Sequence, residues 1–458
     1  MSDSRLEERV DRARLAQLTQ RECERYVAEH AASQRSWQRA RSSQLAGVPM
    51  VWMTGWAGGF PLSFTQAHGN RVTDIDGREY LDFCLGDTGA MAGHSPEPVV
   101  RAIRERVETS GGLTVMLPTE DSLVVCEELQ LRFGLPFWQL TVSATDANRD
   151  LLRICRQVQR RPYVLVFSYC YHGTVDEAQI IIDEGRPALV VGNPGPPVDP
   201  TVTTKVVEFN DLEALEQALR PRDVACLLME PALTNIGIVL PEPGYLEEVR
   251  RLCDETETVL IMDETHTWGA GPGGCTRAWG LRPDALTLGK ALAAGIPMGA
   301  YGLSAALAER LLGDEGTDLV EGGGLGGTLA GNCLASAAAR ATLTEVLTEE
   351  SFARMIALAT RYTNGVAAAI EQHRLPWTII QLGARAEYRF CPQPPRTGGE
   401  SNAAEDHELD EYLHLYTINR GILLTPFHNM TLMCPATSER DVDRHIEVFE
   451  AAASELVG

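Results

Sequence analysis

Short apolar runs recur through the middle of the chain, separated by spacers of helix length. They lie at residues 163–170, 224–229, 259–262, 285–288 and 300–303. Apolar runs of about four to eight residues between helical spacers are typical of strands that are buried on both faces of a mostly parallel sheet. The sequence therefore predicts an α/β fold, and we expect ligands at the carboxyl ends of its strands.

Charge and cysteine content exclude several classes of protein. The 458 residues include 40 Lys and Arg against 63 Asp and Glu, and the net charge of −23 disfavours nucleic acids and anionic membranes as partners. No apolar run approaches the roughly 18 residues that a membrane helix needs. The eleven cysteines include no CxxC pair, and the first residues do not resemble a signal peptide. We therefore expect a cytoplasmic protein with reduced thiols and no metal site.

The basic residues are almost all arginine, and the chain has only two lysines, Lys205 and Lys290. Arginine stays charged in proteins, whereas lysine can become a neutral amine nucleophile. Lys205 lies in a strand-like stretch and is expected to be a solvated charge. Lys290 follows the apolar run at 285–288 and is a candidate catalytic residue, with chance retention as the alternative.

Polar residues follow four of the apolar runs: Tyr171, Glu230, Asp263 and, after Gly289, Lys290. Neighbouring parallel strands end at one sheet edge, so we expect Asp263 and Lys290 to lie close together. They form either a structural ion pair or the site of a cofactor with a pyridinium nitrogen and an aldehyde, which is the combination that pyridoxal phosphate offers. Tyr171 is either an aromatic wall for a planar ring or a buried tyrosine with a satisfied hydroxyl.

Small polar residues mark the start of a helix after the apolar segment at 137–142. The stretch Ser143-Ala144-Thr145-Asp146-Ala147-Asn148 precedes helical sequence from residue 149 onward. The N–H groups at a helix N-terminus bind phosphate readily, because they lack helical acceptors and lie at the positive end of the dipole. The alternative is ordinary capping of the helix by Ser143 or Thr145.

These features, taken together, resemble those of a known family. From about residue 60 to the C-terminus the chain is similar to the class III (subgroup II) pyridoxal-phosphate-dependent aminotransferases, which include glutamate-1-semialdehyde aminomutase. The matching motifs are Val-x-Asp-x-Asp-Gly-x-x-Tyr-Leu-Asp-Phe at 72–83, Gly93-His94 with Pro98, Tyr171-His172-Gly173, Glu230-Pro231, Asp263-Glu264, Pro283-Asp284 with Gly289-Lys290, and Gly327-Thr328 with Asn332.

The resemblance implies the fold type I of pyridoxal-phosphate-dependent transferases. This fold has a large domain with a mostly parallel seven-stranded sheet and a smaller α+β domain built from both termini. We expect residues 1–100 to form the N-terminal segment and part of the small domain, 101–330 the large cofactor-binding domain, and 331–458 the C-terminal small domain. The resemblance also implies a homodimer with active sites at the subunit interface.

The resemblance assigns the two central roles to Lys290 and Asp263. Lys290 is similar to the lysine that is joined to the cofactor aldehyde and shuttles the proton. Asp263 is similar to the carboxylate that keeps the pyridine nitrogen protonated, which makes the ring an electron sink. The catalytic prediction therefore comprises these two residues.

The resemblance also implies cofactor contacts at other positions. Ser143, Ala144 and Thr145 stand where the family binds the phosphate, although Ala144 replaces the usual glycine. Tyr171 is expected to stack on the ring, and Thr328 is expected to reach the phosphate of the neighbouring subunit. The other predicted cofactor residues are His172, Glu230, Asn235 (at the position that contacts the phenolic oxygen) and Thr265 (where valine usually packs on the ring).

The substrate prediction depends on the segment 51–59, which is apolar and has no cation. Relatives that act on β-amino acids carry an arginine there, and a carboxylate without a partner is costly to bury. We therefore expect an amine or acceptor with a bulky apolar or aromatic group; the alternative is that the tryptophans pack the small domain. Arg385 opposes this view unless it pairs with an acid such as Glu387. The predicted substrate-side residues are Trp52, Trp56, Phe60, Asp87, Arg385 and Phe427.

The sequence thus predicts an aminotransferase that moves an amino group from an amine donor to a ketone, aldehyde or keto acid. Pyridoxal phosphate is the expected cofactor, with pyridoxamine phosphate formed between the two halves of a ping-pong reaction. One alternative is a 2,1-aminomutase of the glutamate-1-semialdehyde type, and another is an amino-acid racemase. A third is an inactive dimeric binding protein that retains the fold.

Overall fold

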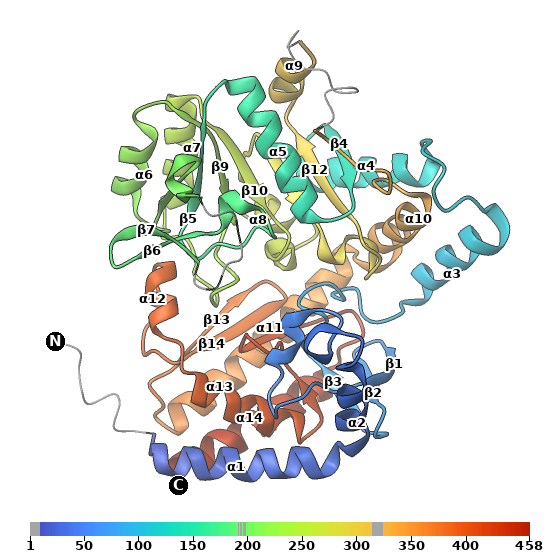
Figure 1. Ribbon diagram of the computed structural model, residues 1–458, viewed down its shortest axis with the longest axis vertical. Helices are drawn as coiled ribbons and strands as arrows, with labels where there is room; N and C mark the ends of the chain where they lie inside the picture. Colours follow the sequence, from blue (N-terminus) through green and yellow to red (C-terminus); the bar gives the residue numbers. More distant parts are fainter. Residues whose placement is uncertain (1–9, 191, 193–194, 196–197, 314–323) are drawn as a thin grey trace. The chain divides into compact units, whose positions relative to one another are not determined.

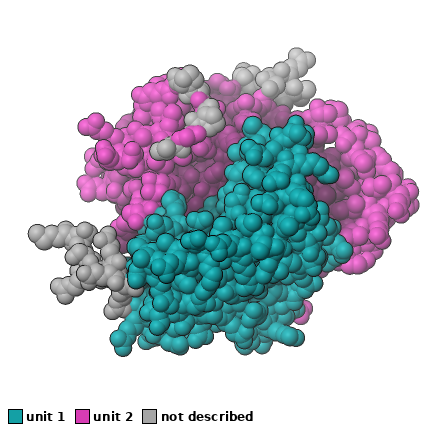
Figure 2. Space-filling model, turned by 60° about the horizontal axis from the view of Figure 1, so that its bottom comes forward, with its two compact units in different colours: residues 1–95, 353–394, 404–458 teal, residues 96–352, 395–403 magenta. Residues whose placement is uncertain are grey.

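The structure is a computed structural model that describes residues 10–458 except 191, 193–194, 196–197 and 314–323, so the N-terminal residues used to predict targeting lie outside it. The chain forms two compact units, which Figure 2 colours separately. The first comprises residues 1–95, 353–394 and 404–458, and the second comprises 96–352 and 395–403. The first unit is therefore built from both ends of the chain, as the resemblance implied.

A seven-stranded sheet is the centre of the second unit (Figure 1). Its strands are β4 (Phe137–Thr141), β5 (Tyr163–Phe167), β8 (Thr204–Val207), β9 (Val224–Met229), β10 (Val259–Asp263), β11 (Ala285–Leu288) and β12 (Gly299–Leu303). The order is β4-β12-β11-β10-β9-β5-β8. All neighbours pair in parallel except β12, which is antiparallel to both β11 and β4. The predicted α/β fold with a mostly parallel sheet is confirmed.

Helices cover both faces of this sheet, because alternate residues of a strand point to opposite faces. Val164 and Val166 of β5 pack in one buried cluster with α5 and α9, whereas Leu165 and Phe167 pack in another with α6 and α7. The helices of this unit are α3 (Glu97–Glu105), α4 (Glu120–Phe133), α5 (Ala144–Gln159), α6 (Leu212–Leu219), α7 (Tyr245–Thr256), α8 (Gly274–Ala278), α9 (Ala305–Gly313), α10 (Cys333–Ala341) and α12 (Gly398–Ala403), and a hairpin joins β6 (Ile180–Asp183) to β7 (Arg186–Leu189).

The first unit contains two small sheets and the longest helices. One sheet has the order β1-β2-β3-β15 and the other β13-β14-β16. Gly77, at φ 84°, lies in the turn of the antiparallel hairpin that β2 forms with β3. The elements are α1 (Arg12–Glu29), α2 (Ala31–Ala40), β1 (Phe64–His68), β2 (Arg71–Asp74), β3 (Glu79–Asp82), α11 (Glu349–Gln372, which begins in the second unit), β13 (Thr378–Leu382), β14 (Arg385–Arg389), α13 (His407–Ile418), β15 (Ile422–Leu423), β16 (Met430–Leu432) and α14 (Glu439–Val457).

The N-terminal helix α1 packs against α13 within the first unit. Asn419 Nδ2 donates hydrogen bonds to both the main-chain oxygen and the carboxylate of Glu22, each at 2.9 Å. Arg12 donates to Asp406 and Glu408 nearer the start of the helix.

Among the described helices, none combines the length and apolarity that crossing a membrane requires.

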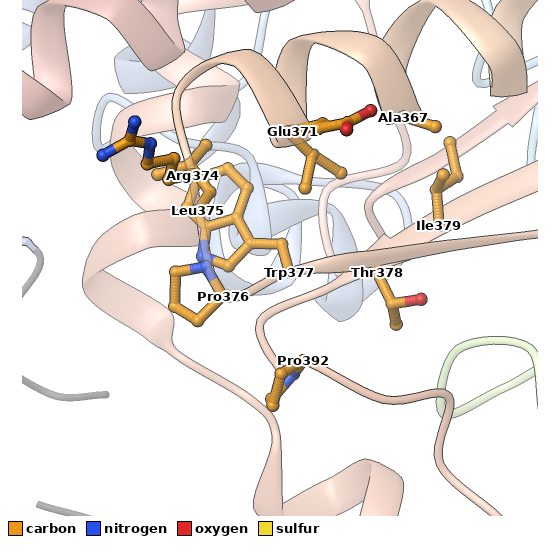
Figure 3. Close-up of a pocket in the computed structure, with 10 residues that line it drawn as sticks. Ala367, Glu371, Arg374, Leu375, Pro376, Trp377, Thr378, Ile379 and Pro392 are labelled. Atoms are coloured by element: carbon orange, nitrogen blue, oxygen red, sulfur yellow. The ribbon is translucent and has the colours of Figure 1, made fainter. Parts of the chain in front are cut away.

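A surface cavity of about 670 Å³ lies where α11 ends and β13 begins (Figure 3). Its wall includes Glu371, Arg374, Pro376 and Trp377. None of the residues singled out by the sequence lines it. The predicted catalytic residues lie instead at the strand ends of the second unit, where Asp263 ends β10 and Lys290 follows β11.

Candidate active site

Asp263 ends β10 and is the centre of a buried polar cluster. Its Oδ2 accepts hydrogen bonds from Asn148 Nδ2 at 2.8 Å and lies 3.0 Å from His172 Nδ1, and its Oδ1 accepts from the Thr265 N–H at 3.0 Å. Burial raises the pKa of the Asp263 carboxyl, but the bonds and charge of these neighbours lower it further, to about 2. Asp263 is therefore a permanent buried anion at neutral pH.

His172 is the cationic partner of Asp263. Burial lowers the pKa of the imidazole, whereas the nearby Cys170 and Asp263 raise it, and the net direction is upward. Asn148 also donates to the His172 main-chain oxygen at 3.2 Å, so one side chain holds both members of the pair. The carboxylate is thereby fixed in position by groups from β10, α5 and the segment after β5.

Lys290 lies at the end of the neighbouring strand. Asp263 is paired with Thr287 in the parallel β10–β11 register, and Lys290 follows three residues later as the first residue of a 3-10 turn, Lys290–Ala293. Its φ of 45° is in the left-handed region that residues with a side chain rarely adopt, and such strain is concentrated at functional sites. Its Nζ lies 2.6 Å from His266 Nε2.

The N-terminus of α5 lies beside this strand edge. Ser143 is the N-cap, and its hydroxyl accepts from the Asp146 N–H at 3.2 Å, so the capping alternative is present in the structure. Thr145 Oγ1 accepts from the Thr174 N–H at 3.2 Å. The N–H groups of Ala144 and Thr145 have no acceptor within the helix and remain suited to an anion. The residue before Lys290, Gly289, packs directly on Ala144.

This close packing predicts the effect of Gly289→Ala. A Cβ at residue 289 would lie 2.8 Å from Ala144 Cβ, a contact that forces a shift. We expect the free energy of unfolding to fall by about 1–3 kcal/mol, with weaker binding of cofactor. Denaturant unfolding and cofactor titration measure both effects. The double variant with Ala144→Gly removes the opposing methyl group and should recover part of the loss; no recovery would refute the packing explanation.

The remaining residues predicted to bind the ring lie near the Asp263 cluster. Glu230 is buried at the end of β9, where its carboxylate accepts from the Tyr171 N–H at 3.2 Å and from the Thr234 hydroxyl. Burial raises the pKa of Glu230. The Tyr171 side chain is 38% exposed, so the alternative of a buried tyrosine is not what the structure shows. Asn235 is half-buried in the segment that follows β9.

Three buried polar atoms of the cluster indicate that it is built for a further group. Thr265 Oγ1, Asn148 Oδ1 and His172 Nε2 are buried without a hydrogen-bond partner among the described residues. A buried polar group without a partner is costly unless a ligand or water completes it. With a buried anion, a lysine amine and the free N–H groups of α5 at one sheet edge, the residues fit the ring nitrogen, the aldehyde and the phosphate of pyridoxal phosphate.

Thr328 is exposed and belongs to a different part of the second unit. It lines a cavity of about 580 Å³ with residues of the segment 114–119 and of β4. Exposed apolar side chains adjoin it, among them Met116 and Leu117. No hydrogen bond links Thr328 to the Asp263 cluster within the described part of the chain. Its predicted role at a neighbouring subunit's phosphate is compatible with this exposure but stays a prediction.

The predicted substrate-side residues belong to the first unit. Trp52 and Trp56 line a largely apolar cavity of about 830 Å³, and Trp52 meets the Phe427 ring edge-on with centroids 5.4 Å apart. Phe60 instead packs in the core with Tyr26 and does not line that cavity. For Phe60 the structure therefore matches the packing alternative.

Arg385 and Asp87 are the two charged residues that were predicted to contact the substrate, and each has a polar contact within the first unit. Arg385 is buried, with Nη2 3.3 Å from Glu387 Oε2, and Glu387 Oε1 lies 3.1 Å from His428 Nδ1. The pairing with Glu387 that the sequence left open is thus present. Asp87 lies in a turn at φ 51°, where its N–H donates to the Cys84 main-chain oxygen at 3.0 Å.

Sequence reasoning missed two side chains of the site, Asn148 and His266. Asn148 stands in the motif at 143–148, one helical turn after Ala144, and that spacing places it on the same face of α5. His266 has no such pattern, because it lies in the irregular segment after β10. Only the position of His266 three residues after Asp263 marked it as a neighbour of the strand edge.

Comparison with known proteins decides the family. The family model described as aminotransferase class-III matches residues 53–451. The chain belongs to the class III aminotransferases. Enzymes of this family depend on pyridoxal phosphate, so the chain is a pyridoxal-phosphate-dependent enzyme with fold type I, as the resemblance implied.

The relatives refine the expected reaction. The crystal structure of a glutamate-1-semialdehyde-aminomutase from Pseudomonas aeruginosa PAO1 is 47% identical, with a TM-score of 0.94 over 98% of this chain and 100% of that one. A glutamate-1-semialdehyde 2,1-aminomutase of Chloroflexus aggregans is 30% identical over 417 residues, 87% of this chain and 92% of that protein. An omega-transaminase from Sphaerobacter thermophilus, at 24% identity and a TM-score of 0.83, shows the fold alone. These similarities favour the aminomutase alternative over the aminotransferase that the sequence first suggested.

Proposed function

We propose that this protein is a pyridoxal-phosphate-dependent 2,1-aminomutase of the glutamate-1-semialdehyde type. Such an enzyme relocates an amino group between adjacent carbons and yields an isomer of its substrate. The observation that carries the proposal is the 47% identity over nearly the whole length of a protein described as such an aminomutase. The arrangement of Asp263 and Lys290 at neighbouring strand ends supports the cofactor that this reaction needs.

In this proposal Lys290 and Asp263 do the chemical work. The cofactor, when bound, supplies an electron-withdrawing ring that stabilises negative charge on the substrate carbon. Asp263 presents a fixed carboxylate to the ring nitrogen, and its low pKa keeps that charge in place. Lys290 would hold the cofactor through Nζ, and its free amine would accept a proton from one substrate carbon and donate it to another.

The other predicted residues bind and orient the cofactor. The N–H groups at Ala144 and Thr145 would hold the phosphate, with Ser143 as the cap that shapes the turn. Tyr171 and Thr265 would contact the ring, and His172, Glu230 and Asn235 are the other residues proposed to bind the cofactor. His172 acts through Asp263, and Glu230 acts by fixing the segment around Tyr171.

A homodimer is part of the proposal. The segment 107–117 carries exposed apolar side chains at Val107, Leu113, Met116 and Leu117, which a second copy of the chain would bury. Thr328 lines a cavity with the same segment and would then contact the partner's phosphate. The soluble small-molecule substrate is expected to enter each site of this dimer.

A second candidate is an aminotransferase for a bulky apolar amine. One observation favours it: the cavity of about 830 Å³ in the first unit, with Trp37, Trp52 and Trp56 in its wall. The ion pair between Arg385 and Glu387 agrees with this candidate, because it already compensates the arginine charge. Trp52 and Phe427 would then contact the apolar group of the amine.

Product analysis separates the two candidates. With glutamate-1-semialdehyde and no other carbonyl compound, we expect sustained turnover to a single isomer of unchanged mass, followed by ¹³C NMR. We expect kcat/KM for 1-phenylethylamine with pyruvate to be at least about 100-fold lower. Equal amounts of a dicarbonyl and a diamino product, or rapid turnover of the amine with pyruvate, would refute the aminomutase and support the aminotransferase.

A further inference from the structure

The side chain of His266 lies within hydrogen-bonding distance of the predicted catalytic amine of Lys290. Its Nε2 lies 2.6 Å from Lys290 Nζ, and the residue is only 4% exposed. Neither the sequence motifs nor the similarity to aminomutases assigns it a role. A histidine so close to a lysine that must act as a base deserves a chemical explanation.

The segment that carries His266 is held firmly by its neighbour Glu264. The Glu264 carboxylate accepts from the Cys275 N–H at 3.1 Å, from the Thr276 hydroxyl at 2.7 Å and from the Thr267 hydroxyl at 2.5 Å. The Glu264 N–H donates to the Thr287 main-chain oxygen at 3.0 Å, which ties the segment to β11. His266 is therefore positioned by the fold and not by Lys290 alone.

The charged groups around this pair are engaged with partners of their own. Asp263 is bonded by His172, and Glu230 by Thr234 and the Tyr171 N–H. Helix α10 and the helical turn at residues 342–346 pack against residues 290–293. Arg340 of α10 forms an ion pair with Asp121 at 2.9 Å, and Glu345 of the turn forms one with Arg101 at 2.6 Å.

Two basic nitrogens 2.6 Å apart cannot both be cationic, because like charges at that distance repel strongly. One nitrogen must therefore donate the hydrogen bond and the other accept it. The amine carries hydrogens that it can donate, and a neutral imidazole offers the lone pair of Nε2 as the acceptor.

We propose that His266 is a positioning residue for Lys290: its Nε2 accepts a hydrogen bond from the Lys290 amine and stabilises the ammonium that this amine becomes during proton transfer. The proton leaves the substrate carbon, resides on Nζ and passes to the second carbon, while His266 ends the cycle as it began. The inference rests on the proposed role of Lys290 as the shuttling base.

The test compares His266→Met, which removes the acceptor, with His266→Gln, which keeps an acceptor oxygen in a side chain of similar length. The full-length enzyme is converted to its pyridoxamine-phosphate form, in which Lys290 is not joined to the cofactor, and is then acetylated briefly at pH 8.5. The chain has only one other lysine, Lys205, which is bonded to Asp223 at 2.6 Å and serves as the internal reference.

We expect the ratio of acetylation at Lys290 to that at Lys205 to rise about tenfold in His266→Met, because this variant loses the charge-assisted hydrogen bond that stabilises the ammonium. His266→Gln should stay within about twofold of the unchanged enzyme. The primary deuterium isotope effect on a substrate labelled at the reacting carbon should increase in His266→Met and be restored in His266→Gln. Unchanged ratios and isotope effects in both variants would overturn the proposal.

The outcome is separable from that of the proposed function. Acetylation needs no substrate, and the isotope effect can be measured with any amine that the enzyme deaminates. An enzyme that proves to be an aminotransferase therefore still tests His266. If His266→Met does not fold, as judged by its circular dichroism spectrum, the shorter His266→Asn replaces it as the variant that cannot reach Lys290.

Discussion

Replacing Lys290 by alanine is expected to lower kcat by about 10⁴-fold or more, because one side chain supplies both the covalent link to the cofactor and the base. The variant should keep the fold, since Lys290 is only half-buried and its Cβ remains. Steady-state kinetics, together with the visible absorbance of the protein after removal of free cofactor, measures the effect.

Lys205→Ala is the matched control for this prediction. Lys205 is the only other lysine, and it lies in β8 with its Nζ bonded to Asp223 and to the Ala218 main-chain oxygen at 2.9 Å. It is therefore a paired charge in place of the solvated one that the sequence suggested. Its loss should leave colour and turnover essentially unchanged. Comparable damage from both substitutions would contradict the assignment of Lys290.

Asp263→Asn is expected to lower kcat by about 10²–10³-fold while the protein stays yellow. The amide has the same shape but no charge, so it cannot hold a proton on the ring nitrogen, and electrostatic stabilisation of this kind has about that magnitude. Lys290 is untouched, and cofactor attachment therefore persists. Turnover and bound cofactor per subunit are the two quantities to measure.

Asn148→Ala separates the charge of Asp263 from its positioning. Asn148 donates to Asp263 Oδ2 at 2.8 Å, and its removal leaves the carboxylate in place but less well oriented. A loss of about tenfold is expected, as for other groups that orient a functional carboxylate. If Asn148→Ala were as damaging as Asp263→Asn, position and not charge would be the essential contribution of the carboxylate.

Much of the second unit was predictable because its elements depend on local patterns. The apolar runs at 224–229 and 285–288 coincide with β9 and β11, and the start of α5 follows the capping residue Ser143. Parallel pairing then brings the ends of β10 and β11 together, which places Asp263 and Lys290 at one edge. These relations follow from strand burial and chain direction alone.

Other features depend on packing that no local pattern contains. β13 (Thr378–Leu382) was not predicted, because it forms by pairing with β14, which in turn pairs with β16. Phe60 was expected in a pocket, but an apolar residue fits a core equally well, and here it packs against Tyr26. The contact between His266 and Lys290 depends on the path that Glu264 imposes on the segment after β10.

Borohydride reduction followed by peptide mapping tests the central claim most directly. The holoenzyme is reduced, digested and analysed by mass spectrometry for a peptide that carries the reduced cofactor. The account predicts one cofactor per subunit on the peptide containing Lys290 and none on the peptide containing Lys205. Cofactor on Lys205, or a protein that binds no cofactor at all, would contradict it.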